Sequence, residues 1–466
     1  MKRCLMVVLV CLVAKCMWCV VSLDSCRAMA LAGNKQLKIA DAEVMRARYE
    51  RRVARAAYFP TLDAEATYMH NQKRLSLIEK DAHLPVMNFD ATSGSYAYDV
   101  VMVDGKPITA NGMPVPAQVA LLPKSALTFD VRNVFVGGVT LTQPVFAGGK
   151  IVASNKMADL AETMAHLGYD MAEEGVIYYV DMAYWGVVSY MAKERLATSY
   201  RSLLNSLYAD VQTMLEQGVA TRADALDVQV RVNEADVALL KAGNDVRLAQ
   251  MSLALLCSLP FDYAIEPDTA ITEASVVQFA INDVLSRNND VKAQELLIKI
   301  NEQKAVVERA TMLPQMAVVG AYTLSNPNSY NGFKNEFGGM FSIGATIKVP
   351  LWHWGGNINK YRMAQSDVVI SRLNLAYTRD KVTLELNKAL CEMEEAVKLC
   401  DAARMNVASA DENMRVARDG FDEGVLTAND VMRSHTAWLA AHSQLIDARI
   451  ATKLCEAKLR LLGACE

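Results

Sequence analysis

The chain has 466 residues, of which 52% are hydrophobic and 21% charged, and its formal net charge at pH 7 is −4. This composition supplies ample apolar surface for a folded core and excludes an intrinsically disordered chain. The sequence has no basic run of the kind that binds nucleic acid, so nucleic acid is not expected as a partner.

The N-terminus, residues 1–22, is predicted to be a secretory signal peptide. Lys2 and Arg3 precede a largely apolar segment, and cleavage is expected after Ser22. Lys15 interrupts the apolar segment, and a buried N-terminal helix is the alternative. Beyond this segment no run of about 20 apolar residues occurs, so membrane-spanning helices are not expected.

The rest of the sequence contains an internal repeat of two similar halves. With an offset of 254 residues for the first part of each half and 206 for the last part, the two halves share identical residues in the same order. Examples are Asn34 with Asn288, Pro60 with Pro314, Gly218 with Gly424, Thr221 with Thr427 and Asp224 with Asp430. This predicts a first structural repeat over 23–258, a connection over 259–276 and a second repeat over 277–466.

Each repeat is expected to contain a helix, two strands, a very long helix, a tight tip and a last helix. In the first repeat these are 23–58, about 61–70 and 133–144, 150–217, 218–221 and 221–258. In the second they are 277–310, about 315–325 and 340–350, 357–423, 424–427 and 427–462. Proline disfavours helix in the residue before it, which sets the first helix end in each repeat.

The first pair of strands is separated by an insertion over about 71–130. Tyr68 and Pro144 are 76 residues apart, whereas Tyr322 and Pro350 are 28 apart. We expect this insertion to be a loop at the outer surface, either a passive loop or a lid.

The helix after each tip carries a ladder of small and apolar residues at alternating spacings of three and four. In the first repeat the ladder is Ala225, Val228, Val232, Ala235, Leu239, Ala242, Val246, Ala249, Leu253 and Leu256. Such sustained periodicity predicts coiled-coil packing against neighbouring helices. The preceding helices, with nearly 70 residues each, would be about 100 Å long.

The strands alternate between apolar and polar residues, as transmembrane β-strands do and as soluble hairpins also do. In 340–350, Phe341 and Ile343 face one way while Ser342 and Thr346 face the other. Four strands cannot close a barrel, and an open strand edge in lipid is forbidden. If the strands span a membrane, the chain must therefore form a homo-oligomer.

The motif Gln143-Pro144-Val145-Phe146 with Gly148-Gly149, the two tip sequences and the order of all elements resemble the TolC family of outer-membrane efflux proteins. The resemblance implies a mainly α fold with a small membrane β part. Three protomers would share a 12-stranded transmembrane β-barrel, four strands each, above a trimeric α-helical barrel of long coiled-coil helices.

The same resemblance implies a location in the outer membrane of a Gram-negative cell, in contact with its lipid, with a long periplasmic extension. The chain would be the passive duct of a tripartite efflux or type I secretion system. Its partners would be a periplasmic adaptor protein and an inner-membrane pump of the RND or ABC type. The alternative from a different class is a soluble periplasmic coiled-coil adaptor or scaffold.

The two tips are the predicted docking sites for the adaptor. Gly218 and Gly424 would permit the chain reversal, and Thr221 and Thr427 would cap the helices that follow.

Acidic residues recur just after each tip, and we expect them to line the periplasmic aperture. Asp224 and Asp227 follow the first tip and Asp430 follows the second. In a trimer each would form a ring of like charges that attracts cations. The resemblance implies this role most directly for Asp430, although Arg433 stands where the family has a second aspartate. The alternative is that the carboxylates only stabilise helix N-termini.

No catalytic, cofactor or metal site is predicted, and the chain is not expected to be an enzyme. Gly148-Gly149-Lys150 lacks the upstream glycine of a phosphate-binding loop. His435 and His442 share a helical face, but they lack the clustered carboxylates or cysteines of a metal site, so packed or surface histidines are expected.

Overall fold

The computed structural model describes residues 21–91, 94–263, 265–268 and 280–464. The predicted signal peptide lies outside the described residues except for its last two, and so do residues 269–276 of the predicted connection. The chain divides into two compact units. A helical unit comprises the described residues of 1–54, 152–306 and 359–466, and a strand unit comprises those of 55–151 and 307–358.

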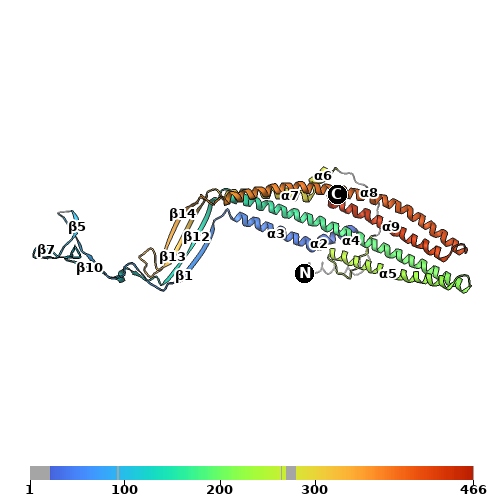
Figure 1. Ribbon diagram of the computed structural model, residues 1–466, viewed down its shortest axis with the longest axis horizontal. Coiled ribbons are helices and arrows are strands. Elements are labelled where there is room, and N and C mark those ends of the chain that lie inside the picture. Colours follow the sequence, from blue (N-terminus) through green and yellow to red (C-terminus); the bar gives the residue numbers. More distant parts are fainter. Residues whose placement is uncertain (1–20, 92–93, 264, 269–279, 465–466) are drawn as a thin grey trace, which may run out of the picture. The chain divides into compact units, whose positions relative to one another are not determined.

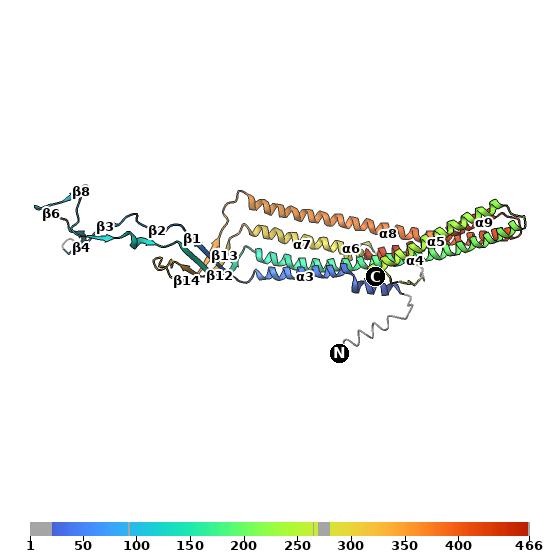
Figure 2. The same ribbon diagram turned by 90° about the horizontal axis from the view of Figure 1, so that it is seen from below.

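The helical unit contains two long helices that each reverse into a shorter one. The helices are α2 (Leu23–Gly33), α3 (Lys35–Ala56), α4 (Lys150–Glu216), α5 (Arg222–Leu256), α6 (Ile281–Arg287), α7 (Asn289–Ala310), α8 (Gly356–Asp422) and α9 (Ala428–Leu461). Figures 1 and 2 show α4 turning back into α5 and α8 turning back into α9. Both α4 and α8 have 67 residues, about 100 Å at the α-helical rise.

Among the helices in the described part of the chain, none is both long enough and apolar enough to cross a membrane.

Two helices that the sequence predicts as continuous are broken by an asparagine. Asn34 separates α2 from α3, and its ψ of 132° is not helical. Its side-chain oxygen accepts a hydrogen bond from the backbone N–H of Gln36, 2.8 Å away. Asn288 separates α6 from α7 and accepts from the N–H of Val291 at 3.2 Å. Each asparagine caps a new helix, so the single helices predicted over 23–58 and 277–310 are wrong.

The predicted ladder of α5 is confirmed by its burial. Ala225, Val228 and Val232 are buried, and the remaining ladder residues are buried or half-buried. Near the tips, residues of α4, α5, α8 and α9 form one apolar cluster that contains Leu204, Leu207, Val211, Ala225, Val228, Val232, Ala235, Phe421, Val431 and Met432. This packing of four helices is the coiled-coil arrangement that the spacing predicts.

The strand unit is built on a four-stranded antiparallel sheet in the order β1–β12–β13–β14 (Figure 1). The strands are β1 (Thr61–His70), β12 (Asn133–Phe146), β13 (Gln315–Asn326) and β14 (Gly338–Lys348). Strand β12 extends beyond the predicted end at 144, because a register shift between Pro144 and Phe146 lets pairing continue past the proline. Strand β14 begins and ends two residues earlier than predicted, since Gly338 already pairs with Ser325.

The insertion after β1 is not an irregular loop. It forms short antiparallel pairs, which Figures 1 and 2 place past one end of the four-stranded sheet. The strands are β2 (Leu75–Ser76), β3 (Ala82–Pro85), β4 (Met87–Asp90), β5 (Ser95–Tyr98), β6 (Met102–Val103), β7 (Lys106–Pro107), β8 (Thr109–Ala110), β9 (Met113–Pro114), β10 (Val119–Leu122) and β11 (Thr128–Phe129). A 3₁₀ turn spans Lys124–Leu127.

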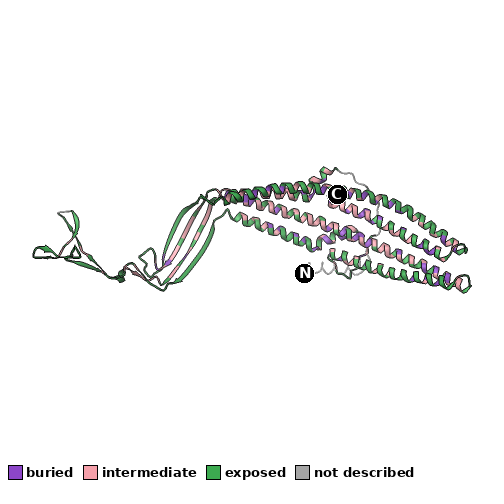
Figure 3. Cartoon of the chain, in the orientation of Figure 1, coloured by how far each residue is buried: buried purple, intermediate pink, exposed green. Residues whose placement is uncertain are grey.

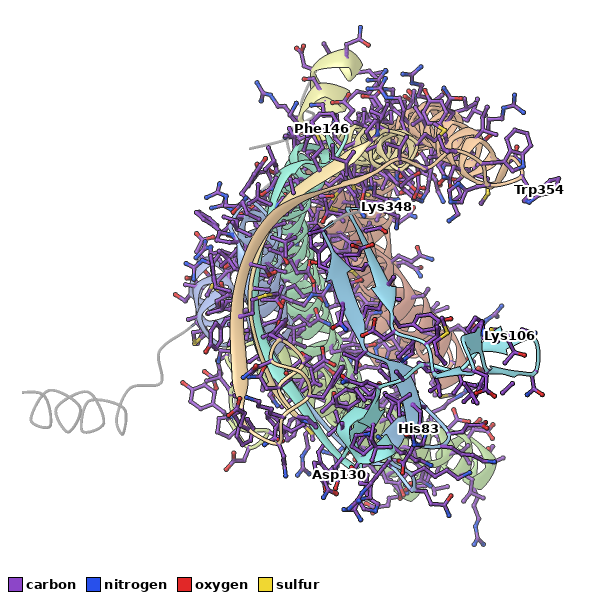
Figure 4. All side chains as sticks on the ribbon, turned by 90° about the vertical axis from the view of Figure 1, so that its left-hand side faces the viewer. His83, Lys106, Asp130, Phe146, Lys348 and Trp354 are labelled. Atoms are coloured by element: carbon purple, nitrogen blue, oxygen red, sulfur yellow. The ribbon has the colours of Figure 1, made fainter. Side chains whose placement is uncertain are left out.

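Two turns of the insertion carry a sequence signal for hairpins that the prediction of a loop overlooked. Asp104-Gly105 joins β6 to β7, and Asn111-Gly112 joins β8 to β9. All four residues have positive φ, between 48° and 80°. Asp-Gly and Asn-Gly favour such two-residue hairpin turns because these residues tolerate the left-handed region. Figure 4 labels His83, Lys106 and Asp130 along this insertion.

Candidate functional site: the helix tips and the exposed sheet

At both tips, a glycine in the left-handed region ends the long helix. Gly218 has a φ of +77° and Gly424 a φ of +76°. The N–H of Gly218 donates to the carbonyl of Leu215 at 3.0 Å, and the N–H of Val219 donates to Met214 at 2.9 Å. The second tip repeats this pattern, with Gly424 bonded to Phe421 and Val425 to Gly420. These paired bonds are the Schellman motif, which satisfies carbonyls that the helix end would leave free.

A capping box begins the helix after each tip. The Thr221 hydroxyl accepts from the N–H of Asp224 at 3.2 Å, while the Asp224 carboxylate accepts from the N–H of Thr221 at 3.0 Å. Thr427 and Asp430 make the same two bonds at 3.3 and 3.1 Å. The structure thus brings the predicted threonines and two of the predicted aspartates into direct contact.

These contacts give Asp224 and Asp430 a helix-end role, and the aperture role of the same carboxylates stays a prediction. Hydrogen bonds from Thr221 lower the pKa of Asp224, and hydrogen bonds from Thr427 lower that of Asp430. Arg433 adds a smaller effect that also lowers the pKa of Asp430. Both groups are therefore anionic at neutral pH. Asp227 lies farther along α5 and is exposed, outside the capping box.

The sequence did not single out the ion pair that links the two long helices near the tips. Arg418 of α8 donates to the Asp210 carboxylate of α4 at 2.7 Å. Both side chains are about one-third exposed, which makes this a partly shielded pair. The only indication in the sequence is that Asp210 and Arg418 lie eight and six residues before the glycines of their tips.

His435 is a core residue of α9. It is 1% exposed, and its Nδ1 atom has no hydrogen-bond partner among the described residues. Burial lowers its pKa to about 4, and the positive charge of Arg418 acts in the same direction. This imidazole is therefore neutral at ordinary pH and packs as an aromatic ring.

His442 belongs to a separate polar contact. Its Nε2 atom lies 2.9 Å from Oδ1 of Asp411, which also accepts from Nε1 of Trp438 at 2.7 Å. The two histidines that share a helical face are thus engaged differently. No group of three or more metal-ligating side chains occurs in the described part of the chain.

The cross-strand register of the sheet places apolar residues of all four strands on one face. One row across the sheet is Leu62, Leu141, Gly320 and Ile343, and the next is Ala64, Val139, Tyr322 and Phe341. The opposite face begins with the row Asp63, Thr140, Ala321 and Ser342. Pairing keeps the alternation in phase over four strands, which a single strand of the sequence does not reveal.

This apolar face is uncovered in the single chain. Ile343 is 73% exposed and Leu62 69% exposed, and Figure 3 shows little buried surface on the four strands. Beyond β14, Trp354 is 89% exposed, and its side chain extends away from the ribbon in Figure 4. The rings of Trp352 and Trp354 contact each other edge to face, 5.9 Å apart. Large exposed apolar surfaces of this kind mark a membrane or protein interface.

Comparison with known proteins places the chain in a family. The family model described as outer membrane efflux protein matches residues 27–257 and 280–464. The chain belongs to the outer membrane efflux protein family. The predicted resemblance and the predicted location in the outer membrane are thereby confirmed. Because the family consists of outer-membrane proteins, a soluble periplasmic adaptor or scaffold is no longer retained as the alternative function.

Individual relatives within this family are distant. The chain is 21% identical over 331 residues to the outer membrane efflux protein BepC of Brucella suis, a match that covers 68% of this chain and 70% of that protein. It is 20% identical over 348 residues to the outer membrane protein TolC of Vibrio cholerae, covering 71% of this chain and 79% of that protein.

Among solved structures, the Campylobacter jejuni CmeC outer membrane channel superposes with a TM-score of 0.72 at 15% identity. The match covers 95% of this chain and 85% of that one. At this identity the likeness establishes the fold of the efflux family.

Proposed function

We propose that the protein is the passive outer-membrane duct of a tripartite efflux or type I secretion system, and that three copies form one channel. The observation that carries this proposal is the exposed apolar face shared by four strands whose sheet has two open edges. A periplasmic adaptor and an inner-membrane pump of the RND or ABC type would complete the pathway. The duct moves its cargo without a chemical step of its own.

The sheet edges support the pooling of strands. Among the described strands, β1 and β14 each pair on one side only. In lipid, an unpaired strand edge leaves backbone N–H and C=O groups without partners, at several kcal/mol each. Three protomers joined from β14 of one copy to β1 of the next would give twelve strands with no free edge, and the apolar face would then meet lipid.

The helical unit carries an apolar seam that its own helices leave exposed. On α8, Met363, Ile370, Tyr377 and Leu384 follow one another at intervals of seven residues and are all more than half exposed. Seven-residue spacing is the signature of a coiled-coil seam. A helix of another protomer would cover this seam in a helical barrel.

The tips support a docking role because each presents an apolar residue at its apex. Val219 and Val425, which follow the two helix-ending glycines, are 76% and 75% exposed. Hydrogen-bonded motifs lie on both sides of these exposed side chains. We propose that they contact the periplasmic adaptor, together with Gly218, Thr221, Gly424 and Thr427.

The test is the mass of the particle extracted from the outer membrane. In detergent, multi-angle light scattering should give three copies, and the same particle should conduct ions in a planar bilayer. A monodisperse monomer that conducts would contradict the proposal, as would recovery of the mature protein in the soluble periplasmic fraction.

A further inference from the structure

Two cysteines from distant parts of the sequence lie together in the largest core cluster of the helical unit. Cys26 of α2 is 0% exposed, and Cys257, which caps the C-terminus of α5, is 3% exposed. The Cys257 thiol donates to the backbone carbonyl of Cys26, with 3.6 Å between sulfur and oxygen. The interaction between the two side chains raises the pKa of the Cys26 thiol, with burial acting in the same direction, and lowers the pKa of the Cys257 thiol.

Contacts on both sides fix this juxtaposition. Nδ2 of Asn34 donates to the carbonyl of Leu256 at 3.3 Å, next to Cys257. At Gly33 an added Cβ atom would lie 2.8 Å from Cβ of Ser258, so the end of α2 and the end of α5 approach as closely as glycine permits. The two cysteines therefore lie together because the backbones that carry them are in contact.

The corresponding place in the second half of the sequence has no thiols. Cys26 falls on Ala280 at the offset of 254, and Cys257 corresponds to Leu462, since each of these two residues is the C-cap of its helix. The helix junction can thus be built without cysteine. The first half instead has cysteine at both members of one contacting pair.

We propose that Cys26 and Cys257 form a disulfide in the mature protein, made in the periplasm while the helical unit folds. In the structure both are free thiols. The proposal rests on the proposed function in one respect, because that function places the helical unit in the periplasm, where disulfides persist.

The chemistry is thiol–disulfide exchange with a periplasmic protein disulfide as the oxidant. One thiolate attacks a sulfur of the oxidant and forms a mixed disulfide, releasing one oxidant thiol. The second thiolate displaces the other oxidant sulfur, which leaves the protein disulfide and a fully reduced oxidant that has taken up two electrons and two protons. The exchange must precede burial, because neither thiol is accessible in the folded chain.

A bond at this place would tether the N-terminal helix to the end of α5. The two cysteines are 231 residues apart, so the bond would close a very long loop and restrict the unfolded chain. The N-terminal helix α2 would then resist local opening, the usual weakness of a chain terminus.

The direct test is peptide mapping of the wild-type protein purified from outer membranes. Free thiols are alkylated in denaturant without reductant, and the protein is then digested with trypsin. We expect a linked pair of peptides, one ending at Arg27 and the other beginning at Leu248, that disappears after reduction. Cys391→Ser, a variant of an exposed cysteine on α8, should retain the link. Alkyl groups on both Cys26 and Cys257 of the wild-type protein would overturn the proposal.

A second measurement compares the thermal midpoint of each protein with and without reductant. The Cys26→Ala variant therefore need not match the wild type in yield. Reductant should lower the thermal midpoint of the wild type and of Cys391→Ser, but leave that of Cys26→Ala unchanged. An equal effect of reductant on all three would count against the bond. Both outcomes are independent of channel function: a conducting trimer without the link refutes only the disulfide, and a soluble monomer with the link refutes only the duct.

Discussion

At the scale of single residues, the two tips repeat one design in which backbone conformation decides which residue is allowed. Gly424 has a φ of +76°, and an added Cβ atom would meet nothing within 4 Å. Replacement by alanine therefore introduces backbone strain without a steric clash. Because a left-handed residue other than glycine costs about 1–2 kcal/mol, Gly424→Ala should destabilise the tip by that amount.

Gly168 provides the matched control for this substitution. It lies inside α4, also has open space around its Cβ position, and has no positive φ. Gly168→Ala should stabilise the protein by about 1 kcal/mol, because alanine is the better helix former. Thermal unfolding followed by circular dichroism should thus shift in opposite directions for the two variants. A shift in the same direction would refute the role assigned to Gly424.

The buried His435 predicts sensitivity to acid. Its folded pKa of about 4 lies below the ordinary value of 6.5, so between these pH values the unfolded chain binds a proton that the folded chain does not. Stability is therefore fully present above about pH 6.5 and is lost as the pH falls towards 4, by up to about 3 kcal/mol per protomer.

His435→Phe should remove much of this dependence, since the ring would still fill the core and the unpartnered Nδ1 would be gone. The measurement is the difference in thermal midpoint between pH 7.5 and pH 5. His166→Gln, a variant of an exposed histidine on α4, should behave like the wild type. An undiminished difference in His435→Phe would show that other groups cause the acid sensitivity.

At the scale of elements, the two faces of β14 predict opposite responses to the same charge. Phe341 belongs to the apolar face and Ser342, its neighbour, to the opposite face. If the apolar face meets lipid, Phe341→Lys should cost up to about 2–4 kcal/mol near the middle of the membrane, whereas Ser342→Lys would face the lumen. The yield of trimer in the outer membrane should fall for the first variant and hold for the second. Equal yields would argue against a lipid-facing sheet.

Elements set by local chemistry could be predicted from the sequence, and elements set by tertiary contacts could not. The strand β1 and the reversals at both tips follow from prolines, glycines and alternation, which act within a few residues. Asn34 and Asn288 lie inside the single helices that the sequence predicts. Their capping bonds instead begin a new helix at each asparagine. In the sequence, each asparagine is followed by two more polar residues, and this pattern could have indicated the break.

In the candidate site, too, features set by neighbouring residues could be predicted and features set by tertiary contacts could not. The threonines that cap the tip helices were predicted correctly, since a capping box is a four-residue pattern. The burial of His435 and the pairing of Arg418 with Asp210 depend on how four helices pack, and no single helix carries that information. The phase of the apolar face likewise emerges only when four strands are paired.

At the scale of the whole molecule, the predicted aperture requires that Asp430 act through its charge as well as through its capping bonds. The carboxylate already accepts from the N–H and the hydroxyl of Thr427. Asp430→Asn removes the charge but keeps an oxygen that can accept these bonds. Thr427→Ala removes the capping hydroxyl but keeps the charge, and should cost about 1 kcal/mol of helix stability.

These two variants separate the two roles in a planar bilayer. If three copies of Asp430 line a narrow aperture, Asp430→Asn should lower cation selectivity and weaken block by trivalent cations, because a ring of like charges attracts cations in a confined lumen. Thr427→Ala should conduct and select like the wild type. Asp224→Asn and Asp227→Asn test in the same way how much the acidic residues of the first repeat contribute to cation selectivity. If selectivity is unchanged in Asp430→Asn while Thr427→Ala lowers the thermal midpoint, the carboxylate serves the helix end alone.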